Sequence, residues 1–167
     1  TNLTGRPLAH CLEVSGAKHL ILDAALAENY ANAASEMNTA LTVWSSGGDV
    51  PGTKNLDSLR AQQPERRLPA DTRKGLTGGD KLFYIYTSGT TGLPKAANFS
   101  HQKFIATSSG GLGISSIGPS DRMYIVLPLY HSAGGVMALG ATLLSGATAV
   151  LARKFSATRF WEDCVNY

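Results

Sequence analysis

Residues 84–95 read Tyr84-Ile85-Tyr86-Thr87-Ser88-Gly89-Thr90-Thr91-Gly92-Leu93-Pro94-Lys95. The β-prone run over residues 82–86 predicts a strand that leads directly into a loop rich in glycine and hydroxyl groups. Glycine gives the backbone conformations that are closed to other residues, and it lets a ligand approach closely. Hydroxyls, backbone N–H groups and a lysine are groups that bind and neutralise phosphates. The segment therefore predicts a phosphate-binding loop after a strand.

The predicted phosphate ligands are the hydroxyl residues, the two glycines and the terminal lysine of this loop: Thr87, Ser88, Gly89, Thr90, Thr91, Gly92 and Lys95. The loop lacks the Gly-x-x-x-x-Gly-Lys-Ser/Thr spacing of a Walker A motif and the Gly-x-Gly-x-x-Gly of dinucleotide sites. It therefore indicates a different class of nucleotide chemistry. The alternative interpretation is an ordinary surface turn rich in glycine and threonine. The strand before the loop and the helix start after it favour phosphate binding.

Composition and charge narrow the function classes. A chain of 167 residues with 43% hydrophobic and 16% charged residues can bury a substantial core and is not expected to be disordered. The net charge of +3 comes wholly from residues 54–81, where seven Lys/Arg face four Asp/Glu. This charge is too small and too dispersed for a nucleic-acid surface. We interpret residues 46–80, which also hold prolines and glycines, as a solvated connector.

The two cysteines, Cys11 and Cys164, lie far apart and lack metal-ligand spacing, so neither a zinc site nor a disulfide framework is predicted. We assign no metal ligand. His10, beside Cys11, is interpreted as a chance neighbour on a helix surface. No apolar run has the length of about 18 residues that a transmembrane helix needs, and no signal peptide is recognisable. The start at Thr1 and the end at Tyr167, within an expected helix, indicate an internal fragment of a longer protein.

Strands and helices are expected to alternate along the chain, which predicts an α/β fold with mostly parallel strands and helical crossovers. Ser100 and Ser156 are predicted N-caps of the helices that follow them. A break is predicted over residues 110–119. Strands are expected at 19–23, 40–45, 82–86, 96–99, 123–129 and 148–152, and helices at 7–15, 24–37, 101–109, 131–144 and 157–166.

A second candidate site lies in the segment Pro128-Leu-Tyr-His-Ser-Ala-Gly134. It places His131 after a predicted strand, and ligands of open α/β sheets bind at the carboxyl ends of strands. A lone histidine near an apolar face is more often a packed structural residue. Together with the upstream loop, however, His131 becomes a candidate catalytic residue.

Residues 84–95 resemble, position for position, the phosphate-loop signature of the acyl-adenylate-forming enzymes, which include acyl-CoA synthetases, luciferases and peptide-synthetase adenylation domains. Three further segments are similar to the fatty-acid transport proteins, the group of very-long-chain acyl-CoA synthetases: Asn2–Leu12, Leu127–Gly134 and Arg153–Cys164. The resemblance implies that residues 1–167 are part of the large N-terminal adenylation domain. The rest of that domain and the small C-terminal domain would be absent from this stretch.

The resemblance also implies a reaction. A fatty acid carboxylate attacks the α-phosphate of ATP to give an acyl-adenylate, and coenzyme A then displaces AMP. Lys95 would neutralise the departing pyrophosphate and His131 would lie beside the acyl carboxylate, both as catalytic residues. Mg²⁺ would bridge the phosphates, with no carboxylate here assigned to it. The family further implies fatty acid uptake and membrane association at the endoplasmic reticulum, peroxisome or plasma membrane.

Two alternatives remain open at this point. One is an adenylating ligase for another carboxylic acid, and the other is a non-catalytic module that binds a nucleotide or a fatty acid. A serine hydrolase is disfavoured because the sequence contains no Gly-x-Ser-x-Gly. The Tyr-Gly-x-Thr-Glu segment, the ribose-binding aspartate and the C-terminal lysine of the resembling family are not found here. We therefore expect residues 1–167 to lack ligase activity on their own.

Overall fold

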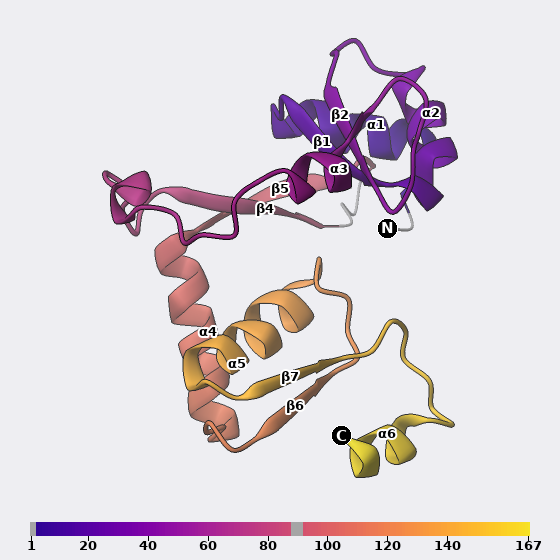
Figure 1. Ribbon diagram of the computed structural model, residues 1–167. Helices are drawn as coiled ribbons and strands as arrows, with labels where there is room; N and C mark the ends of the chain where they lie inside the picture. The colour runs from indigo at the N-terminus through magenta and orange to yellow at the C-terminus, as the bar shows by residue number, and fades with distance from the viewer. Residues whose placement is uncertain (1–2, 88–91) are drawn as a thin grey trace. The chain divides into compact units, whose positions relative to one another are not determined.

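A computed structural model describes residues 3–87 and 92–167 (Figure 1). The chain divides into two units, Thr1–Lys74 with Tyr86–Ala97 and Gly75–Ile85 with Asn98–Tyr167. Strands β4 (Lys81–Thr87) and β5 (Lys95–Ser100) pair in a two-stranded sheet, and each contributes residues to both units. The segment between these two strands is the predicted phosphate loop.

The first unit is built on a parallel sheet with the strand order β1-β2-β3. Its register pairs His19 with Thr42 and Asp23 with Ser46. The buried apolar side chains are small or β-branched for the most part: Ala9, Cys11, Leu22, Ala33 and Val43. Helices α1 and α2 pack on each other. The elements are α1 (Gly5–Ser15), β1 (His19–Asp23), the 3₁₀ turn η1 (Ala24–Leu26), α2 (Ala27–Ala34), β2 (Thr42–Ser46) and β3 (Lys54–Asn55).

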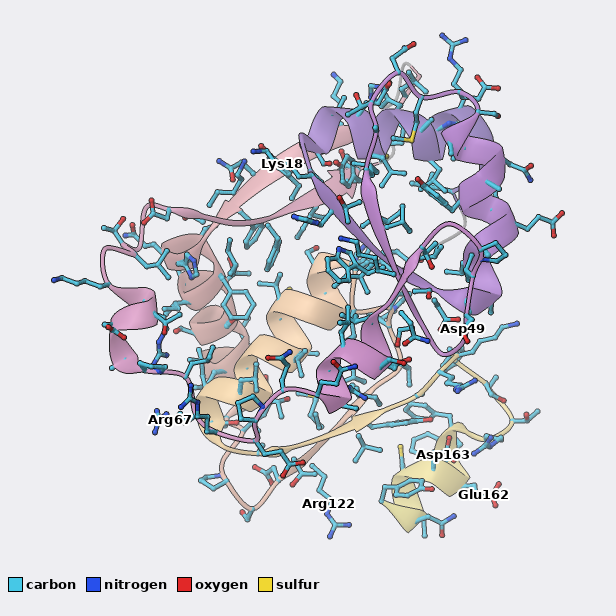
Figure 2. The ribbon with its side chains drawn as sticks, turned by 45° about the horizontal axis from the view of Figure 1, so that its top comes forward. Lys18, Asp49, Arg67, Arg122, Glu162 and Asp163 are labelled. Atoms are coloured by element: carbon cyan, nitrogen blue, oxygen red, sulfur yellow. The ribbon has the colours of Figure 1, made fainter. Side chains whose placement is uncertain are left out.

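A largely exposed stretch follows β2 and contains α3 (Leu56–Ala61) and the 3₁₀ turn η2 (Ala70–Arg73). The carboxylate of Asp57 ties its start to the sheet by accepting hydrogen bonds from Gly47 N (2.7 Å) and Ser46 Oγ (3.0 Å). The Gly47 N–H and the Ser46 hydroxyl hold the pKa of Asp57 below its usual range. Every residue from 58 to 82 is exposed. Figure 2 shows Arg67 projecting away from this stretch.

The second unit pairs β6 (Arg122–Ile125) with β7 (Thr148–Leu151) in parallel. The crossover between them is the π-helical turn η3 (Ser132–Ala138) followed by α5 (Leu139–Ser145). Helix α4 (His101–Ser115) packs along both η3 and α5 (Figure 1). The buried residues of this unit are Phe99, Ser108, Gly111, Ile125, Gly134, Val136, Gly140, Ala141 and Thr142.

The last helix, α6 (Phe160–Asn166), is attached to β6 by one carboxylate. Asp163 accepts a hydrogen bond from the Tyr124 hydroxyl (2.5 Å) and pairs with Arg159 (3.1 Å). The Tyr124 hydroxyl, with Arg159, lowers the pKa of Asp163, and the same hydrogen bond raises the pKa of Tyr124. Figure 2 labels Asp163 on α6. Phe160 packs with Tyr124, with 5.8 Å between the ring centroids, and Phe155 and Trp161 pack against Phe160.

The predicted α/β class is confirmed, because the strand pairs β1–β2, β2–β3 and β6–β7 are all parallel. The strand over 19–23 is found with the predicted bounds. The predicted cap at Ser100 is also confirmed, since its hydroxyl accepts a hydrogen bond from Lys103 N at 3.1 Å. No helix among the described residues is long and apolar enough to cross a membrane.

The break predicted over residues 110–119 is wrong. Helix α4 continues through Gly110 and Gly111 to Ser115, and Ser116 ends it with φ +52°. A Cβ at Gly111 would lie 3.2 Å from the carbonyl oxygen of Met137, so glycine lets α4 lie close to η3. The packing outweighs the cost of glycine in a helix, which is about 1 kcal/mol.

Other predicted boundaries are also wrong, and two of them have a local cause. The helix expected over 24–37 ends at Ala34. The next residue, Ser35, donates its hydroxyl to Asn32 O at 2.9 Å. This local hydrogen bond competes with continuation of the helix. The strand expected over 123–129 ends at Ile125, ahead of Pro128, which has no N–H to donate.

Ser156 is not the N-cap of the last helix. Its hydroxyl lies 3.0 Å from the Thr158 hydroxyl, and α6 begins only at Phe160, after Arg159.

The contact of α5 with α4 is expected to depend on Gly140. A Cβ at this position would lie 2.0 Å from Ser108 Oγ and 2.9 Å from Ser108 Cβ. The Ser108 hydroxyl cannot move away without losing its buried hydrogen bond to Val136 O (3.0 Å). Gly140→Ala should therefore destabilise the complete protein by about 1–3 kcal/mol.

Thermal unfolding checks this prediction, with Gly110→Ala as the matched control. Gly110 also lies inside a helix, but a Cβ there would meet no atom within 4 Å. The control should be neutral or slightly stabilising, because alanine is favoured over glycine in helices by up to about 1 kcal/mol. Equal melting temperatures for the two variants would contradict the packing argument.

Candidate phosphate-binding site

The two ends of the predicted phosphate loop lie together. Strand β4 ends at Thr87 and β5 begins at Lys95. The Thr87 hydroxyl donates a hydrogen bond to the carbonyl oxygen of Lys95 at 3.5 Å, so two predicted ligands are neighbours at the base of the loop. Both residues are exposed. Their hydroxyl and ammonium groups are therefore accessible to a ligand.

The middle of the loop lies outside the described residues, which leaves the predictions for Ser88, Gly89, Thr90 and Thr91 as predictions. Gly92 is described and has φ +143°. Only glycine adopts this backbone conformation without strain. A Cβ there would meet no described atom within 4 Å, so glycine is needed for the backbone path and not for lack of space.

Two residues of α1 and β4 hold the base of the loop, and sequence reasoning did not identify them. His10 Nε2 lies 3.1 Å from the carbonyl oxygen of Pro94, and the Tyr86 hydroxyl donates to the carbonyl oxygen of Cys11 at 2.6 Å. The interpretation of His10 as a chance neighbour of Cys11 on a helix surface did not foresee this contact with the loop. The partners are 84 and 75 residues apart in sequence, and no local pattern reports such a contact. The one available signal was that His10 lies in a segment similar to the fatty-acid transport proteins.

His131 lies directly before η3, in the second unit, and it caps this helical turn. Its Nδ1 accepts a hydrogen bond from Ala133 N at 3.2 Å. In the neutral ring the proton is therefore on Nε2, and the imidazole can offer an N–H to an anionic group. The side chain is exposed. His131 and the phosphate loop belong to different units, and each is described within its own unit.

The main chain around His131 is folded tightly. His131 N donates to Pro128 O at 3.0 Å, and Gly135 N donates to His131 O at 2.8 Å. A Cβ at Gly134 would lie 2.5 Å from Pro128 O, and one at Gly135 would lie 2.0 Å from Leu129 O. Only glycine at both positions permits this approach, which fixes the backbone that carries the imidazole.

An apolar cavity of about 230 Å³ lies between α4, β6 and η3. Its lining is Gly111, Ile114, Ser115, Met123, Ala133, Met137 and Ala138. Ala133 is also the residue whose N–H binds the His131 ring. The cavity and the imidazole are therefore attached to the same turn of η3.

The described residues combine two chemical functions. Thr87 and Lys95 offer a hydroxyl and a positive charge at the base of a glycine-containing loop, which suits a polyphosphate. His131 offers an N–H next to an apolar cavity, which suits a carboxylate with an apolar chain. Among residues 3–87 and 92–167, no cluster of three or more His, Cys, Asp and Glu side chains could hold a metal ion.

The chain matches the family model described as AMP-binding enzyme over residues 1–167. Long-chain fatty acid transport protein 1 of Bos taurus is 44% identical over 171 aligned residues, which cover 99% of this chain and 26% of that protein. The chain thus spans about a quarter of the length of this curated relative.

Two solved structures have the same fold. The anthranilate CoA ligase AuaEII in complex with anthranoyl-AMP is similar with a TM-score of 0.82 and 20% identity, covering 99% of this chain and 31% of that chain. ATP-bound MatB from Rhodopseudomonas palustris is similar with a TM-score of 0.72 and 22% identity, covering 93% of this chain and 29% of that chain.

Replacement of Gly92 is expected to weaken the binding of ATP to the complete protein. Gly92→Ala forces a side chain into a backbone conformation that costs roughly 1–3 kcal/mol, so the dissociation constant should rise about 5- to 100-fold. Titration calorimetry with ATP measures this change. Gly118→Ala is the control, because a Cβ there would be in ordinary contact, 3.8 Å from Asp121 Oδ2, without a positive φ. Equal affinities of the two variants would favour an ordinary surface turn.

Proposed function

The chain belongs to the family of AMP-binding enzymes, and from this premise we propose that the complete protein activates long- or very-long-chain fatty acids to acyl-CoA. The observation that carries the proposal is the 44% identity to a long-chain fatty acid transport protein over 99% of the chain. A carboxylate oxygen attacks the α-phosphorus of ATP, the bond to the β-phosphate breaks, and pyrophosphate leaves. The thiolate sulfur of coenzyme A then attacks the acyl carbon and releases AMP.

In this proposal the phosphate loop binds the triphosphate. A carboxylate is a poor nucleophile, so the rate depends on neutralising the phosphates and on positioning the attack in line. The Thr87 hydroxyl exchanges its long hydrogen bond to Lys95 O for one to a phosphate oxygen, and Lys95 neutralises the charge that develops on pyrophosphate. Ser88, Gly89, Thr90, Thr91 and Gly92 complete the set of donors. Mg²⁺, when bound, would neutralise further phosphate charge, and no described carboxylate is assigned to it.

His131 orients the fatty acid. Its Nε2–H donates to the carboxylate or to the α-phosphate, because Nδ1 is already engaged with Ala133 N. The apolar cavity supports this role, since it is lined by Ala133, whose N–H binds the imidazole, and so offers an acyl chain an apolar surface on the same turn of η3. We further propose that the complete protein associates with a membrane and takes part in fatty acid uptake; the name of its relative, long-chain fatty acid transport protein 1, supports the uptake.

The proposal is tested by ATP–pyrophosphate exchange in the complete protein with Mg²⁺ and a panel of acids. Exchange that requires a long-chain or very-long-chain fatty acid supports it. Exchange with an aromatic or short-chain acid in place of a fatty acid supports a different adenylating ligase. Binding of ATP or fatty acid without any exchange supports a non-catalytic binding module.

Lys95→Ala should lower the rate of ATP–pyrophosphate exchange by roughly 10²–10³, the loss seen when one preorganised donor is removed from a transition state. The melting temperature should barely change, because the side chain is exposed. Lys18→Ala removes another exposed lysine and serves as the control. Unchanged exchange, or a collapse of the melting temperature, would show that Lys95 does not have this role.

His131→Ala should lower the adenylation rate by about 10² while affecting thioester formation from supplied acyl-AMP less. His131→Asn is the matched variant. Asparagine is a good N-cap whose side-chain oxygen can replace Nδ1 as the acceptor for Ala133 N, but it has no Nε2–H.

A catalytic role predicts that both variants lose adenylation and that Asn keeps the stability of the native protein. If His131 is purely structural, the His131→Asn variant should have the adenylation activity of the native protein. Single-turnover assays of the two half-reactions, with melting curves, separate these outcomes.

A further inference from the structure

We propose that His10 and Tyr86 are positioning residues that attach the base of the phosphate loop to α1 and so set the geometry with which it binds the triphosphate of ATP. The inference rests on the proposed function for the identity of the ligand. It concerns two residues that are not among the candidate phosphate ligands, although Tyr86 lies within the segment that resembles the family signature.

The two hydrogen bonds reach the two ends of the loop. Tyr86 lies at the end of β4 and donates its hydroxyl to Cys11 O at 2.6 Å. Pro94 lies directly before β5, and its carbonyl oxygen is 3.1 Å from His10 Nε2. His10 and Cys11 are consecutive residues of α1, so neighbouring positions on this helix contact both ends of the loop.

Each attached residue directly precedes a candidate ligand. Tyr86 is bonded to Thr87, and Pro94 is bonded to Lys95. A fixed Pro94 carbonyl restricts the peptide plane from which Lys95 starts, because the peptide unit is planar. The hydrogen bond from Thr87 Oγ1 to Lys95 O, at 3.5 Å, then joins the two ligands to each other. The three hydrogen bonds together define the base of the loop.

Helix α1 is a suitable support because it is itself immobilised. Ala9 and Cys11 are 2% and 5% exposed, and α1 packs on α2. The two hydrogen bonds thus attach the residues on both sides of the loop to a packed helix.

The hydrogen bond between His10 and the Pro94 carbonyl determines which substitutions of His10 can preserve the contact. A proline carbonyl can only accept, so His10 Nε2 must carry a hydrogen in this contact. The amide nitrogen of glutamine can donate from a similar position, whereas leucine fills the space without a donor. His10→Gln should therefore keep the contact and His10→Leu should lose it. Tyr86→Phe removes only the hydroxyl that binds Cys11 O.

The test uses the complete protein and two readouts, amide hydrogen exchange of the loop without ATP and the dissociation constant of ATP. His10→Leu and Tyr86→Phe should each accelerate exchange in the segment 87–95 and raise the dissociation constant about 3- to 10-fold, as expected for one net hydrogen bond. His10→Gln should behave like the native protein. Tyr84→Phe is the matched control, since this hydroxyl lies on the same strand and binds Lys81 Nζ at 2.7 Å.

Two results would overturn the proposal. One is loop exchange and ATP affinity in His10→Leu and Tyr86→Phe that equal those of Tyr84→Phe. The other is exchange that rises equally in α1, β1 and the loop, which would mean that the bonds stabilise the fold in general. A protein that fails to exchange pyrophosphate with any fatty acid would refute the proposed function alone. Hydrogen exchange of the loop would still decide whether His10 and Tyr86 order it.

Discussion

The chain leaves β6 at Ile125 and has to cross back to the end of the sheet at which β6 starts before it can begin β7 at Thr148, because the two strands are parallel. Parallel strands cannot be joined by a tight turn. The return is made by η3 and α5, and it begins at His131. The requirement of parallel pairing thus places the candidate catalytic histidine after the carboxyl end of a strand, where ligands of open α/β sheets bind. In the first unit, α2 makes the corresponding return from β1 to β2.

Small residues allow the segment that connects β6 to β7 to pack closely on its neighbours. The main chain of residues 127–129 contacts the positions of Gly134 and Gly135, and Gly140 lies against Ser108 of α4. Protein interiors are close-packed, so each of these approaches would be lost with a larger side chain. The close packing of α4 on η3 also brings the buried Ser108 hydroxyl within hydrogen-bond distance of the main-chain oxygen of Val136, to which it donates. Packing therefore fixes both the backbone beneath His131 and the wall of the neighbouring apolar cavity.

The phosphate loop is organised in a different way. Its candidate ligands, Thr87 and Lys95, are exposed and contribute little to packing. Their geometry depends on hydrogen bonds between side chains and main-chain carbonyls at the base of the loop, two of which come from the α1 region. The candidate ligands are thus different residues from those that connect the loop to α1. Such an arrangement leaves the Lys95 ammonium group exposed to a ligand, while Tyr86 and His10 connect the residues at the base of the loop to α1.

The sequence by itself determined the α/β class, the strand over 19–23, the cap at Ser100 and the candidate ligands. These follow from local signals, namely hydrophobic runs, capping residues and a motif of adjacent positions. Only the tertiary structure decided that α4 continues through Gly110 and Gly111 and that His10 contacts the main chain at Pro94. In each case the deciding contact joins residues that are far apart in sequence or depends on a close approach of two backbones. Local propensity cannot report such contacts, because their energy exists only once the chain has folded.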